Sequence, residues 1–165
     1  GTEFVAVRYG NCWGSKGSVL EAWEAARASG LPPRLTDSRC TRFNISRSDA
    51  VSLVLLALET AKPGELWIPR LPTYRIGDLC MAWRLVYGVD AQPEVVGLRL
   101  AEKLHEDLIS THESISCKTK GVERYILEPG VIHEQGGWGY SSGTPGHQLG
   151  VDELVKMVDS WRQSR

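Results

Sequence analysis

The chain has 165 residues, of which 42% are hydrophobic and 24% charged, and its formal net charge at pH 7 is −1. This length suits one domain, and this composition excludes an intrinsically disordered chain, which would carry fewer apolar groups and more net charge. Nineteen basic residues are offset by 20 acidic ones without a Lys/Arg block, so we expect no nucleic-acid partner. The most apolar stretch, residues 51–58, is far shorter than the roughly 20 residues that cross a bilayer, so we expect no membrane segment.

Cysteine usage and the N-terminus bear on the compartment. The N-terminal residues show neither the basic region nor the apolar core of a secretory signal, and the four cysteines are scattered without a C-x-x-C pair. We therefore expect a cytoplasmic protein with reduced thiols. We expect no metal site, because zinc ligands need close spacing.

The first predicted elements are a buried strand, a glycine loop and a helix. Residues 4–9 are an apolar run rich in β-formers, and a loop with three glycines follows at residues 10–17. Residues 19–26 place apolar side chains at i, i+3, i+4 and i+7, which predicts a helix that ends near Gly30. A glycine loop before a helix can hold an anion, but this spacing matches neither the P-loop nor the dinucleotide fingerprint. A plain turn and a ligand loop both remain open.

The middle of the chain predicts a capped helix between two short strands. Residues 41–45 indicate the first strand. Ser46 begins the helix, with Asp49 three residues later as its capping-box partner. Residues 50–58 are apolar nearly all round, which predicts a deeply buried helix. Residues 65–68 indicate the second strand.

Strands and helices continue to alternate, which predicts an α/β fold. An amphipathic helix at residues 76–83 ends at Gly88. We expect strands at residues 94–98 and 123–127 and a short helix at residues 102–109.

The C-terminal part begins with a long loop. Residues 129–150 hold seven glycines and two prolines, and loops of this length are usually functional or mobile. Residues 151–162 predict a C-terminal helix with one apolar face. Neither a linker nor a repeat divides the sequence, so we expect a single domain over residues 1–165.

Isolated charged side chains beside predicted strands are candidate ligand contacts. Arg42 and Arg99 lie at strand ends, where open α/β folds bind ligands, and a planar guanidinium suits a diphosphate. Considered alone, each of these two arginines is more simply interpreted as a solvated surface charge than as a ligand contact. His105, beside Glu106, is a candidate general base or metal ligand, although a structural or surface histidine is the simpler interpretation. No tyrosine is followed four residues later by a lysine.

Five stretches, in order and in register, resemble one protein family. They are residues 4–19 (FVAVRYGNCWGSKGSV), 41–51 (TRFNISRSDAV), 64–76 (GELWIPRLPTYRI), 96–106 (VGLRLAEKLHE) and 140–142 (YSS) with the C-terminal helix. Together they are similar to bacterial polysaccharide-biosynthesis nucleotide-sugar 4,6-dehydratases, which are extended short-chain dehydrogenases/reductases of the UDP-N-acetylglucosamine 4,6-dehydratase type. The resemblance covers residues 2–160 and only the C-terminal part of the family's pattern, because the dinucleotide loop and the Tyr-x-x-x-Lys dyad have no counterpart here.

This resemblance implies a fold, a ligand and partners. The implied fold is the substrate-binding part of an extended short-chain dehydrogenase/reductase, with its N-terminal Rossmann half absent. The implied function is binding of a nucleotide sugar, a UDP-N-acetylhexosamine, without catalysis by this chain alone. No cofactor is expected on this chain alone, and NAD(P) is expected in the complete family enzyme. The implied partners are further copies in a homo-oligomer and, for a split enzyme, a separate Rossmann subunit.

The resemblance also implies roles for individual residues, none of them catalytic or metal-binding. The seven implied substrate-binding residues are Asn11, Ser15, Lys16, Ser18, Arg42, Arg99 and Glu102. By this resemblance the asparagine lies at the sugar diphosphate and the serines and lysine cover the substrate. The two arginines grip the diphosphate, and the glutamate holds ribose hydroxyls.

The sequence departs from the family pattern at three places, and two other functions remain open. Trp13 replaces a smaller aliphatic residue of the family pattern, and Asn44 replaces an aromatic residue. Leu100-Ala101 replaces the family's Pro-Gly. The main alternative is a non-catalytic sugar-nucleotide-binding or oligomerising module that associates through a bared strand edge and an apolar face. The weaker alternative is an unrelated enzyme that uses His105 and Glu106.

Overall fold

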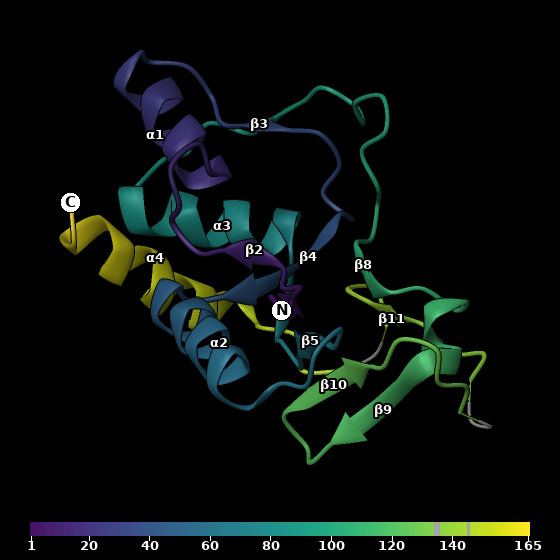
Figure 1. The fold of residues 1–165 in the computed structure, drawn as a ribbon. Helices are drawn as coiled ribbons and strands as arrows, with labels where there is room; N and C mark the ends of the chain where they lie inside the picture. The colour runs from purple at the N-terminus through teal and green to yellow at the C-terminus, as the bar shows by residue number, and fades with distance from the viewer. Residues whose placement is uncertain (134–135, 145) are drawn as a thin grey trace.

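The computed structural model describes residues 1–133, 136–144 and 146–165 as a mixed α/β fold (Figure 1), so the predicted fold class is confirmed. Its helices are α1 (Val19–Ala28), α2 (Arg47–Thr60), α3 (Ile76–Tyr87), α4 (Val151–Gln163) and the short 3-10 helix η1 (Glu113–Ser116). Its strands are β1 (Ala6–Val7), β2 (Asn11–Cys12), β3 (Arg34–Leu35), β4 (Thr41–Ile45), β5 (Leu66–Pro69), β6 (Thr73–Arg75), β7 (Glu94–Val95), β8 (Asp107–Ile109), β9 (Cys117–Lys120), β10 (Arg124–Leu127) and β11 (Tyr140–Ser141).

The described strands form one larger sheet and several small ones. The larger sheet has the order β1-β5-β10-β9, in which β1 is parallel to β5 and β10 is antiparallel to both of its neighbours. A second sheet has the order β2-β4-β6, with β2 parallel and β6 antiparallel to β4. The pairs β3–β7 and β8–β11 are separate. The β9–β10 hairpin extends away from the helices (Figure 1), which leaves β1 at the opposite edge of the larger sheet.

A tryptophan-rich core joins α1, α3 and α4, which lie together on one side of the molecule (Figure 1). Trp23 of α1 and Trp83 of α3 are fully buried with their ring centroids 5.9 Å apart. Leu154 and Val158 of α4 are also fully buried in this cluster. These positions follow the helical spacing of the sequence, because apolar residues three and four apart share one helix face. Trp23 and Leu35 of this core also line the cavity that forms the candidate site.

Two helix boundaries predicted from the sequence are confirmed. The Ser46 hydroxyl accepts a hydrogen bond from the Asp49 backbone N–H (3.0 Å) and donates one to the Asp49 carboxylate (2.6 Å). This cap satisfies one of the N–H groups that the first helical turn leaves unpaired, and Asp49 accepts from the Ser46 hydroxyl instead of from the backbone N–H that a full capping box would use. At the other boundary α3 ends at Gly88, whose φ of 62° lies in the left-handed region that glycine adopts without steric cost.

The helix predicted at residues 102–109 is wrong. Residues 107–109 form β8, and the preceding backbone pairs with distant groups instead of with itself. The Leu104 carbonyl accepts a hydrogen bond from the Thr41 backbone N–H (2.9 Å), and the Lys103 carbonyl accepts one from Arg42 (3.1 Å). Because these carbonyls are satisfied by β4, the segment follows β4 rather than its own helical pattern. The strand predicted at residues 4–9 is shorter than expected, since only Ala6–Val7 forms β1.

The prediction that α2 is deeply buried is also wrong. Its inward face, with Leu53 and Ala57, packs in a cluster with Trp67 of β5. The outward face leaves Val51, Leu55 and Leu58 between 53% and 67% exposed. The sequence is apolar all round this helix, but the sheet covers only one side of it.

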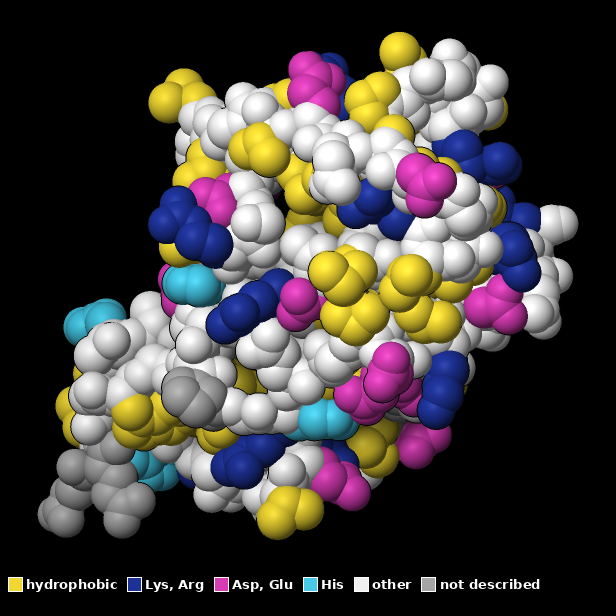
Figure 2. All heavy atoms as spheres, turned by 180° about the vertical axis from the view of Figure 1, so that it is seen from behind, with side chains coloured by type: hydrophobic (Ala, Val, Ile, Leu, Met, Phe, Trp, Pro, Cys, Tyr) yellow, Lys and Arg dark blue, Asp and Glu magenta, His cyan; other side chains and the backbone are white. Residues whose placement is uncertain are grey.

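The surface mixes charges of both signs. On the face shown in Figure 2, Lys and Arg side chains are interspersed with Asp and Glu, and a group of hydrophobic side chains lies near the middle. The four cysteines are free thiols. Within the described ranges, none of the helices combines the length and the apolar character needed to span a bilayer.

Candidate functional site

A cavity of about 550 Å³ opens between the loop before α1, strand β3, strand β4 and the turn at residues 99–102. This volume is in the usual range of small-ligand sites, roughly 300–1,000 Å³. The seven residues that the family resemblance marked as substrate-binding all line it: Asn11, Ser15, Lys16, Ser18, Arg42, Arg99 and Glu102. The structure therefore brings together residues that are up to 91 positions apart in the sequence (102 − 11).

The glycine loop forms one wall of this cavity, and packing accounts for two of its glycines. A Cβ atom on Gly10 would lie 2.3 Å from the Phe43 Cβ atom, so only glycine lets β4 approach this closely. Gly14 has a φ of 61°, and a Cβ there would lie 2.4 Å from the Trp161 ring. These glycines are thus needed for close contacts within the protein. The following residues, Ser15 to Ser18, face the cavity.

Two side chains at the start of α1, Lys16 and Ser18, have polar groups without a partner among the described residues. Ser18 is the N-cap residue of α1 but makes no side-chain capping bond, and its buried hydroxyl has no hydrogen-bond partner among the described residues. The first N–H groups of a helix carry a partial positive charge and favour an anion. Lys16, exposed beside them, makes no ion pair within the described part of the chain. This wall therefore offers a cation, a hydroxyl and a helix N-terminus.

Arg42 and Glu102 are joined in a network that fixes the opposite wall. Arg42 is 9% exposed, and its guanidinium donates to the Thr41 carbonyl (2.7 Å), the Lys103 carbonyl (3.1 Å) and the Glu102 carboxylate (3.0 Å). The same Glu102 oxygen accepts a hydrogen bond from the Thr36 hydroxyl (2.9 Å). Most donors of Arg42 are therefore already used in holding residues 102–104 against β4.

The turn that carries Arg99 depends on the same carboxylate. The Glu102 backbone N–H donates to the Arg99 carbonyl (3.0 Å), which closes a four-residue turn. The other Glu102 carboxylate oxygen accepts from the Arg99 backbone N–H (3.3 Å). Arg99 itself is exposed, and its side chain makes no ion pair with any described residue. Glu102 thus positions the turn, and Arg99 presents a free guanidinium at the cavity.

The electrostatic balance of the cavity is positive. Four basic side chains line it (Lys16, Arg34, Arg42 and Arg99), against the single carboxylate of Glu102. Arg42 is compensated by Glu102, and Arg34 pairs with Glu94 (3.0 Å). Lys16 and Arg99 are consequently the cations available to a bound anion.

Sequence reasoning missed several lining residues. Thr36 and Arg34 lie on or beside β3, which is placed by pairing with β7 some 60 residues later, and no local signal marks them. Tyr74 of β6 also lines the cavity. Burial raises the pKa of Tyr74 to about 12, with nearby Arg42 acting in the opposite direction, so its hydroxyl is neutral at pH 7. Tyr74 can therefore offer a hydrogen bond but no charge.

His105 takes part in a different cluster. Its Nδ1 atom lies 2.8 Å from the Thr41 hydroxyl, which in turn lies 2.7 Å from the Ser142 hydroxyl. The Ser142 hydroxyl also accepts from the Glu106 backbone N–H (2.9 Å). This cluster ties the segment at residues 105–106 to the C-terminal loop, and neither His105 nor Glu106 lines the cavity.

Comparison with known proteins gives consistent results. Residues 1–127 match the family described as "Polysaccharide biosynthesis protein". The chain is 40% identical over 116 residues to the UDP-N-acetylglucosamine 4,6-dehydratase (inverting) of Campylobacter jejuni, which covers 68% of this chain and 33% of that protein. It is 30% identical over 120 residues to the UDP-glucose 4-epimerase of Rickettsia canadensis, which covers 73% of this chain and 35% of that one. The chain thus spans about a third of the length of these relatives.

A solved structure matches almost the whole chain. The crystal structure of Pen from Bacillus thuringiensis superposes with a TM-score of 0.84 at 26% identity, over 97% of this chain and 50% of that one. The expected fold, a part of an extended short-chain dehydrogenase/reductase, is confirmed. By sequence pattern and by fold, the chain belongs to the family described as "Polysaccharide biosynthesis protein".

Proposed function

We propose that this chain is the nucleotide-sugar-binding portion of a 4,6-dehydratase or epimerase of polysaccharide biosynthesis, and that its cavity holds a UDP-N-acetylhexosamine. The observation that carries the proposal is the convergence of all seven family-derived residues on one cavity with two uncompensated cations. A relative that is 40% identical is a UDP-N-acetylglucosamine 4,6-dehydratase, which supports the choice of sugar.

The diphosphate would lie between Lys16 and Arg99. These two cations come from opposite walls, and the N-terminus of α1 adds backbone N–H groups on the same side as Lys16. The exposed guanidinium of Arg99 can form the paired hydrogen bonds that suit phosphate oxygens. The free Ser18 hydroxyl and the Asn11 side chain would face the sugar. Arg42 and Glu102 would act mainly by holding the Arg99 turn in place.

The cofactor NAD(P) does not fit the residues of this chain. Its glycine loop lacks the spacing of the dinucleotide-binding motif. The space beside Gly10 is occupied by Phe43 and that beside Gly14 by Trp161, so neither glycine is open to a pyrophosphate. We therefore derive no redox step for this chain. Its part in the reaction would be to bind and orient the sugar nucleotide, which lowers the entropic cost of the chemistry. A cytoplasmic location stays a prediction.

Isothermal titration calorimetry with UDP-N-acetylglucosamine tests the proposal. We expect Arg99→Ala to weaken binding about 10- to 100-fold, because a charge-assisted hydrogen bond contributes about 1.5–3 kcal/mol. Lys16→Ala should weaken binding in the same direction. Lys62→Ala is the matched control, since it removes an exposed lysine that does not line the cavity. Absence of binding by the wild type, or equal affinity of wild type and Arg99→Ala, would contradict the proposal.

We infer a second candidate function, self-association, from the exposed face of α2. Val51, Leu55 and Leu58 lie at i, i+4 and i+7 and form a continuous apolar stripe. Sedimentation velocity should show concentration-dependent dimers or larger species for the wild type. Leu55→Glu should shift the protein to monomer, whereas Glu59→Gln is a control on the same helix. A wild-type monomer at high concentration would rule out this function.

A further inference from the structure

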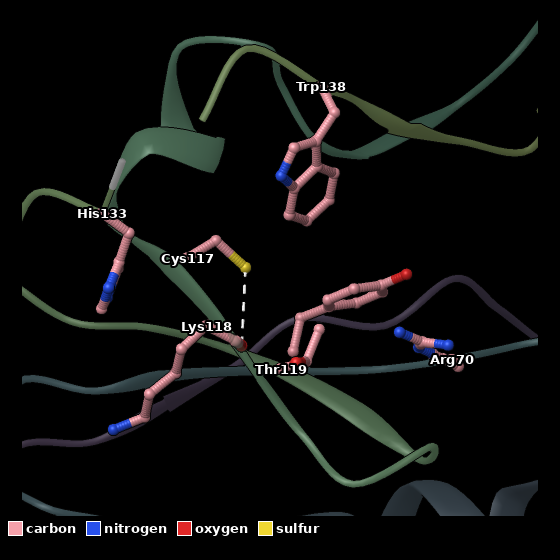
Figure 3. Close-up of a pocket in the computed structure, with 7 residues that line it drawn as sticks. Arg70, Cys117, Lys118, Thr119, His133 and Trp138 are labelled. Atoms are coloured by element: carbon pink, nitrogen blue, oxygen red, sulfur yellow. Dashed lines mark hydrogen bonds between the residues drawn. The ribbon is translucent and has the colours of Figure 1, made fainter. Parts of the chain in front are cut away.

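A second cavity lies at the other end of the molecule, between the β9–β10 hairpin and the segment around Trp138 (Figure 3). Its volume is about 600 Å³, and it shares no lining residue with the first cavity. Strand β5 contributes to it through Arg70, the residue that follows the strand. The family resemblance assigns no residue of this cavity.

Arg70 is held in place without being neutralised. Its guanidinium carbon lies 4.6 Å from the centre of the Tyr125 ring, a stacking contact that limits the side chain's freedom. Among the described residues, Arg70 makes neither an ion pair nor a side-chain hydrogen bond. Stacking engages the face of a guanidinium and leaves the N–H groups at its edge free. Arg70 is therefore a pre-oriented cation with unused donors.

The other basic groups near this cavity are already compensated. Lys118 pairs with the carboxylates of Glu128 and Glu65. The His133 ring lies beside the same Glu128, with Nε2 at 3.3 Å from Oε2. The Cys117 thiol adds no charge, because burial raises its pKa to about 11. Among the described residues, the uncompensated charge that a ligand meets here is therefore that of Arg70.

Aromatic rings and free polar groups form the rest of the wall. Trp138 packs against Tyr125 with centroids 5.3 Å apart, and Tyr125 packs against Tyr140 at 5.0 Å. Trp138 is only half-buried, and Figure 3 shows its indole on the opposite side of the cavity from Thr119. Within the described residues the Trp138 indole N–H, the Tyr125 hydroxyl and the Thr119 hydroxyl make no hydrogen bond.

We propose that this cavity binds a sugar that carries a phosphate or carboxylate group, with the anion at Arg70 and the sugar ring against Trp138. The guanidinium edge matches two oxygens of either anion. An indole face packs well against an apolar ring face, and the free hydroxyl and indole groups match the sugar hydroxyls. A flat aromatic anion would leave those polar groups unpaired, so the surroundings favour a sugar.

Titration calorimetry with glucose 1-phosphate and with glucuronate tests this site and separates its two anion classes. We expect one of them to bind, and Arg70→Gln to weaken that binding at least about tenfold, which corresponds to the loss of a charge-assisted hydrogen bond. Trp138→Leu should weaken it as well. Inorganic phosphate and methyl glucoside, which carry only the anion or only the ring, should bind more weakly than the combined ligand.

Two control variants make the outcome decisive. Lys120→Gln also removes one positive charge close to the cavity, from the β9–β10 hairpin, but Lys120 stacks on Trp67 and does not line the cavity, so binding should be unchanged. Arg99→Ala removes the cation of the first cavity and should also leave this binding unchanged. No binding by the wild type, equal losses in Arg70→Gln and Lys120→Gln, or loss in Arg99→Ala would overturn the proposal. If Trp138→Leu fails to fold by circular dichroism, the exposed Arg70→Gln variant decides.

Discussion

Ala101 occupies a backbone conformation that its own side chain disfavours. Its φ of 67° is the one positive value at a non-glycine position in residues 1–133, 136–144 and 146–165. It is the third residue of the turn closed by the Glu102-to-Arg99 hydrogen bond, and a type II turn places a left-handed residue there. The family pattern has Pro-Gly where this chain has Leu100-Ala101. We therefore predict that Ala101→Gly stabilises the protein.

The magnitude follows from two opposing effects. A left-handed conformation costs an L-residue about 1–2 kcal/mol, and glycine removes this cost. Glycine also gives the unfolded chain more conformational freedom, which lowers the free energy of unfolding by about 0.4–1 kcal/mol. Ala101 is exposed, so the substitution loses no buried contact. The free energy of unfolding should rise by about 0.5–1 kcal/mol, which moves the melting temperature of a chain of this size by a few degrees at most, about 1–4 °C.

Urea denaturation followed by circular dichroism measures this change. Ala91→Gly is the matched control, because Ala91 is also exposed in a loop and its φ is not positive. It should be neutral or destabilising, since only the unfolded-state effect operates. A loss of stability in Ala101→Gly similar to that in Ala91→Gly would refute the conformational argument.

Three further predictions concern buried or paired polar groups, each measured by urea denaturation. Asn44→Leu should stabilise the protein by about 1–2 kcal/mol, because the buried side-chain amide oxygen of Asn44 has no hydrogen-bond partner among the described residues. A destabilised variant would show that this oxygen is hydrogen-bonded. Arg42→Ala should cost about 3 kcal/mol, because it removes the charged partner of Glu102 and one donor to each of two backbone carbonyls, and a loss well under 1 kcal/mol would contradict the network. Arg8 holds the pKa of Glu113 at about 2, below its usual 4.5, so this pair's stabilisation is complete above pH 4.5 and is lost as the pH falls toward 2. Arg8→Ala should flatten that acid-induced loss, and an unchanged pH profile would speak against the pairing.

Local sequence signals predicted where helices begin and end better than they predicted which distant segments pack against each element. The Ser46–Asp49 cap and the glycine end of α3 depend on neighbouring residues, so the sequence contains them. The segment at 102–109 failed because its backbone hydrogen bonds go to β4, about 60 residues earlier, and no periodicity encodes such a partner. The single-domain assignment stays a prediction.

The candidate site was found through the family resemblance rather than through residue chemistry. The glycine loop and two isolated arginines were ambiguous by themselves, and their meeting in one cavity depends on the long-range pairing of β2 with β4 and of β3 with β7. The engagement of Arg42 with backbone carbonyls could not be anticipated, because an arginine's partners are not visible in the sequence. Thr36 was missed for the same reason.

The two free cations of the first cavity are mounted on separate pieces of the chain, one on the loop before α1 and one on the turn after β7. An anion that binds both side chains would connect these two segments directly. Its arrival should slow amide hydrogen exchange in both segments at once, and to a similar degree, because each is then restrained by the other.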